Sequence, residues 1–274
     1  AGAISNPGGR SGAPGDGGIL AGAAAVTSGM RVLVIIPTYN ECENLPVLAR
    51  QILDAHPFRI LVVDDQSPDG TGAIADELAR AHPGRLDVLH RTGPRGLGLS
   101  YVDGFGWALQ SGAELICQMD ADFSHDPRYL PDLIEATRDY DLVLGSRYLN
   151  GISVVNWPLQ RIVLSTFANG YVRAVTGLSP RDTTSGFRCW RREALARLPL
   201  DRILSQRYAF MVETLFEAAR LGCRITEVPI IYVERRQGAS KMSGRVLLES
   251  MVMPWRLLLR HRGRLRTGSG AGTR

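Results

Sequence analysis

Two aspartates one residue apart, Asp120 and Asp122, are the side chains of this 274-residue sequence whose spacing points most clearly to chemistry. They follow the apolar run Glu114–Met119, so they are expected at the end of a buried strand. Carboxylate oxygens at this spacing suit a hard divalent cation, Mg²⁺ or Mn²⁺, which keeps open positions for diphosphate oxygens. The neighbouring His125 is expected to be a surface residue without a ligand role.

Two further loops carry polar side chains directly after predicted strands. Proline and asparagine explain part of the first loop as a turn, but they do not explain Tyr39 and Glu41 together. In the second loop, Asp64 and Asp65 directly follow a buried strand, where unpaired carboxylates are costly. A nucleotide base or ribose that donates hydrogen bonds would stabilise such a carboxylate.

The elements that must position these loops follow from the hydrophobic pattern. Short β-branched runs alternate with helical periodicity from Arg31 onward. The predicted strands are Arg31–Ile36, Arg59–Val63, Leu86–His90, Glu114–Met119 and Asp141–Gly145. The predicted helices are Asn44–Ala55, Thr71–Ala81, Gly98–Gln110 and Leu130–Thr137. This alternation predicts an α/β fold with a mostly parallel sheet, helices on both faces and ligands at the carboxyl ends of the strands.

Six motifs along the chain resemble those of a known family. The motifs PTYNE, VVDDQSPDGT, DADFSH and GSRY, in this order, resemble the family 2 glycosyltransferases, which have the GT-A fold. Downstream, DTTSGFR and RRQGASK resemble the dolichyl- and polyprenyl-phosphate mannose synthases, which use GDP-mannose. The similar region extends from about Arg31 to Arg260.

The resemblance implies roles for the donor side. It assigns the nucleotide to Pro37, Tyr39, Glu41, Val63 and Asp65, and the metal and diphosphate to Asp120, Ala121 and Asp122. Asp122 is the expected direct metal ligand. Ser124 stands where some family members have a glutamine ligand, and its shorter hydroxyl group would reach the metal through water.

The resemblance also implies a clamp for the acceptor phosphate, formed by Arg147, Arg161, Ser165, Thr184 and Ser185. Arginine after a strand is well suited to bidentate phosphate recognition, and positions 161 and 165 share a helix face. The alternative for Arg161 is a solvated helical charge.

Arg235 and Lys241 match the family's RxxGxSK loop, which would close over the diphosphate. Lys241 is the only lysine among 32 basic residues, which suggests that its compact charge is required there. The expected catalytic residues are Asp122, Arg147, Arg235 and Lys241. A phosphate monoester is largely a dianion at neutral pH, so direct inverting attack would need no general base.

The formal net charge of +5 is unevenly distributed. Residues 235–274 hold ten basic residues and one acid, a charge of +9, whereas residues 1–234 carry −4.

The predicted organisation is a disordered extension over 1–29, a GT-A domain over 30–244, and a basic amphipathic helix and tail at the membrane interface over 245–274. The alternative is a helix packed on the body. Two further helical stretches, Ile162–Val175 and Tyr208–Leu221, are candidates for a lipid groove.

Four scattered cysteines predict reduced thiols, and no export signal or run of 18 apolar residues is evident. The expected location is therefore cytoplasmic and peripheral, on the inner face of a membrane. The expected partners are GDP-mannose, a polyprenyl phosphate lipid and the membrane surface, with a membrane-anchoring subunit or a fused module in addition.

Three other functions stay open at this point. One is a polyprenyl-phosphate glucosyltransferase that uses UDP-glucose. The second is a nucleic-acid-binding module, which the acidic body and the lack of aromatic residues within the basic tail argue against. The third is an inactive scaffold, which the intact DADFS and RxxGxSK loops argue against.

Overall fold

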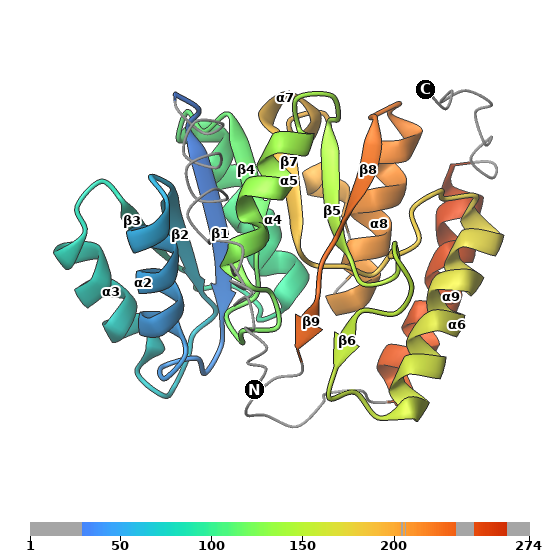
Figure 1. The fold of residues 1–274 in the computed structure, drawn as a ribbon, viewed down its shortest axis with the longest axis horizontal. Helices are drawn as coiled ribbons and strands as arrows, with labels where there is room; N and C mark the ends of the chain where they lie inside the picture. The colour runs from blue at the N-terminus through green and yellow to red at the C-terminus, as the bar shows by residue number, and fades with distance from the viewer. Residues whose placement is uncertain (1–28, 204, 206, 234–243, 262–274) are drawn as a thin grey trace, which may run out of the picture.

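The computed structural model describes residues 29–203, 205, 207–233 and 244–261 (Figure 1). The extension predicted over 1–29 lies almost wholly outside the described residues, as do the RxxGxSK loop and the tail after residue 261.

A seven-stranded sheet forms the centre of the protein, with the strand order β3-β2-β1-β4-β7-β5-β8. All neighbouring strands are parallel except β7, which is antiparallel to both β4 and β5. The predicted mostly parallel α/β fold is thereby confirmed. The strands are β1 (Val32–Thr38), β2 (Arg59–Asp64), β3 (Leu86–His90), β4 (Leu115–Gln118), β5 (Leu142–Ser146), β7 (Arg188–Arg191) and β8 (Ile225–Pro229).

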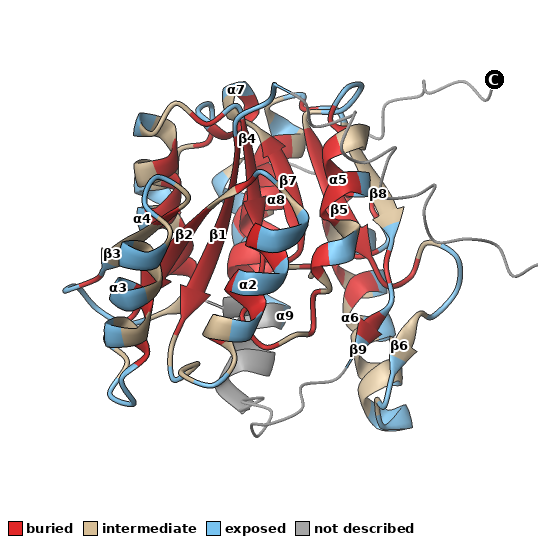
Figure 2. Cartoon of the chain, turned by 60° about the vertical axis from the view of Figure 1, so that its left-hand side comes forward, coloured by how far each residue is buried: buried red, intermediate tan, exposed pale blue. Residues whose placement is uncertain are grey.

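Helices cover both faces of this sheet, and the side-chain period of two assigns each strand residue to a face. In β1, Leu33 and Ile35 face the core formed with α4, α8 and α9, whereas Val34 and Ile36 face the core formed with α2, α3 and α5. The central strands are therefore almost wholly buried (Figure 2). The helices are α2 (Leu45–Ala55), α3 (Thr71–Ala81), α4 (Leu97–Gln110), α5 (Leu130–Ala136), α6 (Leu159–Thr176), α7 (Arg192–Leu195), α8 (Arg207–Arg220) and α9 (Gly244–Arg260).

A second, two-stranded parallel sheet lies beside the start of α6 (Figure 1). It joins β6 (Val154–Val155) to β9 (Tyr232–Val233), and residue 154 is the register partner of residue 232. This small sheet brings the segment before α6 close to the chain that leaves β8.

Helices α6 and α9 pack side by side at one end of the molecule (Figure 1). The Tyr171 hydroxyl group donates to the carbonyl oxygen of Met251 at 2.7 Å and accepts from Trp255 Nε1 at 2.9 Å. Helix α8 instead packs against the sheet core, α4 and α9. The helix that lies beside α6 is therefore α9, and not the stretch Tyr208–Leu221 that the sequence suggested.

Candidate functional site

The three motif loops lie side by side because β2, β1 and β4 are neighbours in the sheet and parallel. Each loop contains one non-glycine residue with a positive φ angle. These residues are Asn40, Gln66 and Phe123, with φ of 61°, 60° and 61°. A bulky residue such as phenylalanine is rarely found there, and such backbone strain concentrates at functional sites. The carboxyl edge of the sheet therefore has the local signature of an active site.

The loop after β1 is anchored to its neighbours through Tyr39 and Glu41. The Tyr39 hydroxyl group accepts a hydrogen bond from Arg95 Nη1 at 2.7 Å, and the Arg95 guanidinium carbon lies 5.1 Å from the tyrosine ring centre. Glu41 accepts from Asn44 Nδ2 at 2.7 Å, and its amide donates to Thr71 Oγ1 at 2.9 Å. Within the sheet, Pro37 and Val63 are register partners.

The loop after β2 has its carboxylates already paired with protein groups. Asp65 forms a buried ion pair with Arg91 and accepts from the amide of Gly96 at 2.8 Å. Asp64 lies near the Ser67 amide at 3.4 Å and near His90 Nδ1 at 3.8 Å. The cost of a buried unpaired carboxylate is therefore met by protein groups, most clearly at Asp65. Asp65 fixes the segment before α4, and its contact with a nucleotide base stays a prediction.

The loop after β4 orients the DXD carboxylates through three neighbours. The Tyr101 hydroxyl group donates to Asp120 Oδ1 at 3.2 Å, and the Asp120 amide donates to His125 Nδ1 at 3.1 Å. The Ser124 amide donates to Asp122 Oδ1 at 3.0 Å. Asp122 is buried, whereas Asp120 is partly exposed. The loop is thus folded around the two carboxylates.

His125 is buried, so its expected position on the surface is wrong. Its ring stacks on Phe187 with centroids 5.0 Å apart. Burial lowers the pKa of His125 more strongly than the nearby Asp120 raises it. Because the ring is neutral, its Nδ1 can accept the hydrogen bond from the Asp120 amide. His125 therefore anchors the DXD loop from within the core.

Arg147, directly after β5, is locked in place by Asp182. Its Nε and Nη2 donate to the two carboxylate oxygens at 2.7 and 2.6 Å, and its amide donates to the same carboxylate at 3.0 Å. Thr184 Oγ1 accepts from Nη2 at 2.8 Å. Burial alone would lower the pKa of Arg147, but the charge and hydrogen bonds of Asp182 outweigh it and raise the pKa. Arg147 is a permanent, fixed cation.

The structure brings the other predicted acceptor residues near Arg147. The Arg161 guanidinium carbon lies 4.1 Å from the ring centre of Trp157, and Arg147 lies 5.5 Å from that same ring. The hydroxyl group of Tyr148 donates to Ser165 Oγ at 2.7 Å. Arg161 and Ser165 do share α6, as predicted. The buried Ser185 hydroxyl group instead donates to the carbonyl oxygen of Gly145 at 2.6 Å, which holds its loop against β5.

Residues 33–198 of the chain match the family described as Glycosyl transferase family 2. The chain belongs to this family. It is 47% identical over 251 residues to a polyprenol monophosphomannose synthase of Mycolicibacterium smegmatis, and the match covers 90% of this chain and 93% of that relative. It is also 49% identical over 237 residues to an undecaprenyl-phosphate mannosyltransferase of Micrococcus luteus, covering 85% of this chain and 97% of that relative.

A solved structure of glucosyl-3-phosphoglycerate synthase from Mycobacterium tuberculosis, in complex with Mn²⁺ and UDP-glucose, is similar in fold. The TM-score is 0.63 at 18% identity, and the match covers 97% of this chain and 88% of that chain. At this identity the likeness shows the fold alone. It supports the predicted GT-A-type architecture of this glycosyltransferase.

The DXD loop of the glycosyltransferase has the donor set of a hard divalent cation. Asp120 and Asp122 supply carboxylates, and the buried Ser124 Oγ makes no well-formed hydrogen bond within the described part of the chain, although the Tyr232 hydroxyl group lies near it. Among the described residues no three His, Cys, Asp or Glu side chains gather into a complete metal site. Two carboxylates and a hydroxyl group are oxygen donors of the kind that Mg²⁺ and Mn²⁺ bind, and Mg²⁺ usually takes its other ligands from water and substrate phosphates.

Two predicted catalytic residues of this glycosyltransferase, Arg235 and Lys241, lie outside the described residues. Their roles stay predictions that rest on the RxxGxSK motif.

Sequence reasoning missed three residues that support the site. Tyr101 reaches the DXD loop from α4, and its only sequence signal is its place in a Gly-rich helix start. Arg188 is wholly buried on β7, where its hydrogen bonds go to neutral groups including Thr214 Oγ1 at 3.0 Å and the Met211 carbonyl oxygen at 2.9 Å. Burial lowers the pKa of Arg188 to about 9. The third residue, Trp157, has no motif around it.

Proposed function

We propose that this glycosyltransferase transfers mannose from GDP-mannose to polyprenyl phosphate with inversion, giving a polyprenyl-phosphate β-mannose, and that it depends on a divalent metal. The observation that carries the proposal is the match, at 47% and 49% identity over nearly the whole chain, to two relatives whose names specify mannose and a polyprenyl carrier. The paired arginines beside the DXD loop support it, because they offer a site for a second phosphate group.

Fixed positive charge on the acceptor side fits a nucleophile that arrives already ionised. The second pKa of a phosphate monoester is about 6, so the acceptor is mostly a dianion at neutral pH. Arg147 stays protonated and is oriented by Asp182. The guanidinium groups of Arg147 and Arg161 both lie over the indole ring of Trp157. In the proposed step an acceptor oxygen forms a bond to the anomeric carbon while the bond to the diphosphate oxygen breaks on the opposite face. The proposed catalysis is by positioning and electrostatics.

The donor side would stabilise the departing GDP. Asp120 and Asp122, with Ser124 beside them, would hold a divalent ion, which supplies positive charge to the diphosphate when it is bound. Arg235 and Lys241 of the RxxGxSK loop would add two more cations. Tyr39, Glu41, Val63 and Asp65 would hold the nucleoside.

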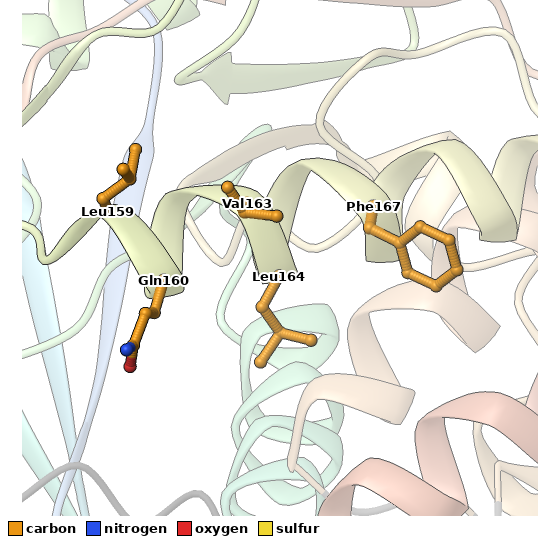
Figure 3. Close-up of a pocket in the computed structure, with 5 residues that line it drawn as sticks. All are labelled: Leu159, Gln160, Val163, Leu164 and Phe167. Atoms are coloured by element: carbon orange, nitrogen blue, oxygen red, sulfur yellow. The ribbon is translucent and has the colours of Figure 1, made fainter.

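The surface of α6 supports contact with a lipid. Leu159, Val163 and Phe167 recur every fourth residue and are 74%, 60% and 66% exposed. With Gln160 and Leu164 they line an apolar hollow on the helix (Figure 3). Because α6 begins beside Trp157, a phosphate at the arginines would leave its prenyl chain next to this surface.

Helix α9 adds exposed apolar side chains next to α6. Trp255 and Leu259 are exposed, whereas Met253 and Leu257 on the other face are buried against the body. None of the described helices is long and apolar enough to cross a membrane. We infer peripheral attachment to the cytoplasmic face of a membrane through α6, α9 and the basic tail, with or without a separate membrane subunit or fused module.

The test is transfer of radiolabel by the purified chain from GDP-mannose to undecaprenyl phosphate in detergent. We expect label in an organic-extractable, mild-acid-labile product, dependent on Mg²⁺ or Mn²⁺ and lost in Asp122→Asn. Equal labelling from UDP-glucose would overturn the mannose assignment. Full turnover of Asp122→Asn with saturating metal would overturn the assigned metal site.

A further inference from the structure

The indole ring of Trp157 contacts both arginines that we place at the acceptor phosphate. The guanidinium carbon of Arg161 lies 4.1 Å from the ring centre and that of Arg147 lies 5.5 Å away. Like charges repel each other, and the negative face of an indole ring attracts each cation that lies over it. The two cations thus share one aromatic partner.

The backbone on both sides of Trp157 is conformationally restricted. Asn156 adopts a positive φ of 63°, and Pro158 is the N-cap residue of α6 with an extended conformation. The indole Nε1 is buried and has no hydrogen-bond partner within the described residues. A buried donor without an acceptor is unfavourable, so the polar atom of Trp157 does not explain its placement and the contacts of the ring do.

A continuous row of rings connects Trp157 to the DXD loop. Trp157 meets Tyr232 edge to face at 5.3 Å, and Tyr232 meets His125 edge to face at 5.9 Å. His125 stacks on Phe187 and accepts the amide of Asp120. Tyr232 also lies 5.3 Å from the guanidinium carbon of Arg147. The row therefore connects the DXD loop to Trp157 and Arg147 through direct ring contacts.

We propose that Trp157 is a positioning residue for the acceptor phosphate, which holds the guanidinium groups of Arg147 and Arg161 as a pair facing one dianion. This inference rests on the proposed function, because it takes that dianion to be the phosphate of the polyprenyl acceptor. Trp157 itself touches neither the reacting oxygen nor the anomeric carbon. Without its ring, the long side chain of Arg161 gains rotamer freedom that phosphate binding must then remove.

The test compares Trp157→Leu and Trp157→Phe with the unaltered chain by initial rates on a short-chain prenyl phosphate in detergent. For Trp157→Leu we expect the KM for the prenyl phosphate to rise about tenfold, while the KM for GDP-mannose stays within about twofold. Trp157→Phe keeps an aromatic face and is expected to restore most of the acceptor affinity. A purely structural role of Trp157 would not raise the KM for the prenyl phosphate while leaving the KM for GDP-mannose nearly unchanged.

Trp107→Leu is the matched control. Trp107 also faces an arginine, with the guanidinium carbon of Arg59 5.7 Å from the ring centre. Arg59 is the first residue of β2, so this pair lies at the amino ends of the strands, away from the loops at their carboxyl ends. This variant should leave both KM values unchanged. If Trp157→Leu does not fold, a double-mutant cycle between Trp157→Met, which fills space without an aromatic face, and Arg161→Ala gives the answer, and we expect the two effects on acceptor KM to be non-additive.

Several outcomes separate the two levels of the proposal. An active unaltered chain whose acceptor KM does not change in a folded Trp157→Leu, or an additive double-mutant cycle, overturns the role of Trp157 and leaves the proposed function intact. Transfer from UDP-glucose instead of GDP-mannose, with the acceptor effect preserved, overturns the donor assignment and supports Trp157. No transfer to prenyl phosphate from either donor by the unaltered chain overturns both.

Discussion

The carboxylates of the DXD loop owe their orientation to neighbours, of which Tyr101 on α4 stands outside every sequence motif. Asp120 receives a hydrogen bond from Tyr101 and is tied through its amide to His125. On the side that we propose for the acceptor, Arg147 receives its orientation from Asp182. At the scale of single residues, the charged groups of the site are therefore positioned by partners from other elements, and these partners can be removed without removing the charges.

Tyr101→Phe deletes the hydroxyl group that holds Asp120 and leaves the ring in place. We expect the metal concentration for half-maximal activity to rise about tenfold, because neighbours that orient a ligand affect metal affinity by this order. A metal titration of activity measures it. Tyr140→Phe, which alters an exposed tyrosine, is the control. An unchanged metal requirement in Tyr101→Phe would contradict the assignment of Asp120 to the metal.

Asp182→Asn leaves Arg147 buried without its counter-charge. We expect a loss of about 3–5 kcal/mol in the free energy of unfolding at pH 7, the usual cost of breaking a buried pair from one side. Urea unfolding measures this loss. Arg192→Gln, which alters a half-buried arginine whose side chain donates to α4 carbonyl groups, serves as the comparison and should cost less.

The same pair predicts a pH dependence. Burial alone would raise the pKa of Asp182, but Arg147 outweighs it and lowers the pKa below its usual value. The stabilisation is therefore complete above the unfolded-state pKa of about 3.9 and is lost as the pH falls through the lower pKa of the folded state. We expect the stability difference between the unaltered chain and Asp182→Asn to be constant from pH 7 to pH 5 and to shrink below pH 4. A difference that grows on acidification would refute this account.

At the scale of elements, the junction of α4 and α8 determines where Tyr101 points. A Cβ atom at Gly98, in the first turn of α4, would lie 2.7 Å from the carbonyl oxygen of Ser205 and 3.1 Å from Phe210. These contacts involve backbone and a buried ring, so neither can move aside cheaply. The first turn of α4 can approach α8 this closely only with glycine.

Gly98→Ala is therefore expected to destabilise the protein by about 1–3 kcal/mol, the usual cost of overpacking. Thermal or urea unfolding measures the change. Gly106→Ala on the same helix is the matched control, because a Cβ there meets open space. Alanine is favoured over glycine in a helix interior, so this control should be neutral or stabilising by up to about 1 kcal/mol. Equal effects of the two variants would rule out the packing argument.

The elements that repeat a clear pattern were predictable, and those that depend on distant partners were not. The strand Leu86–His90 and the helix Thr71–Ala81 have the bounds that the sequence predicted. Strand β7 was missed because RCWR is short and begins with an arginine, a residue that polarity alone places on the surface. The site shows the same division: Asp120 and Asp122 stand in a motif, whereas Trp157 meets Tyr232 only after 75 residues of chain have folded.

At the scale of the whole molecule, charge is separated between the body and the end of the chain. The sequence assigns −4 to residues 1–234 and +9 to residues 235–274. On α9, Arg260 is already engaged with the buried Glu213 of α8, at 3.2 Å. The basic residues beyond α9 are therefore the ones that we assign to anionic lipid.

Replacing Arg262, Arg264 and Arg266 by glutamine should weaken binding to anionic vesicles by about 1 kcal/mol per residue at low salt. Vesicle co-sedimentation at increasing NaCl concentration measures it, and we expect the difference between variant and unaltered chain to fade as salt rises. The control makes the same charge change at Arg50, Arg80 and Arg138, which are exposed on the body. Binding of the tail to duplex DNA with equal strength would contradict a lipid-directed role.

The antiparallel strand β7 has a consequence for how this enzyme can be diversified. Because β7 returns beside β5, the roughly forty residues from 147 to 187 leave the sheet and re-enter it at adjacent positions. The bond from the Gly145 amide to the Phe187 carbonyl oxygen and the Arg147–Asp182 pair close the base of this excursion. The segment from 147 to 187 contains Trp157, Arg161 and Ser165, and it contains none of the loops that we assign to the nucleotide-sugar donor. We therefore expect it to behave as an exchangeable cassette, so that grafting the corresponding segment of a relative would change the lipid that is glycosylated while the sugar stays the same.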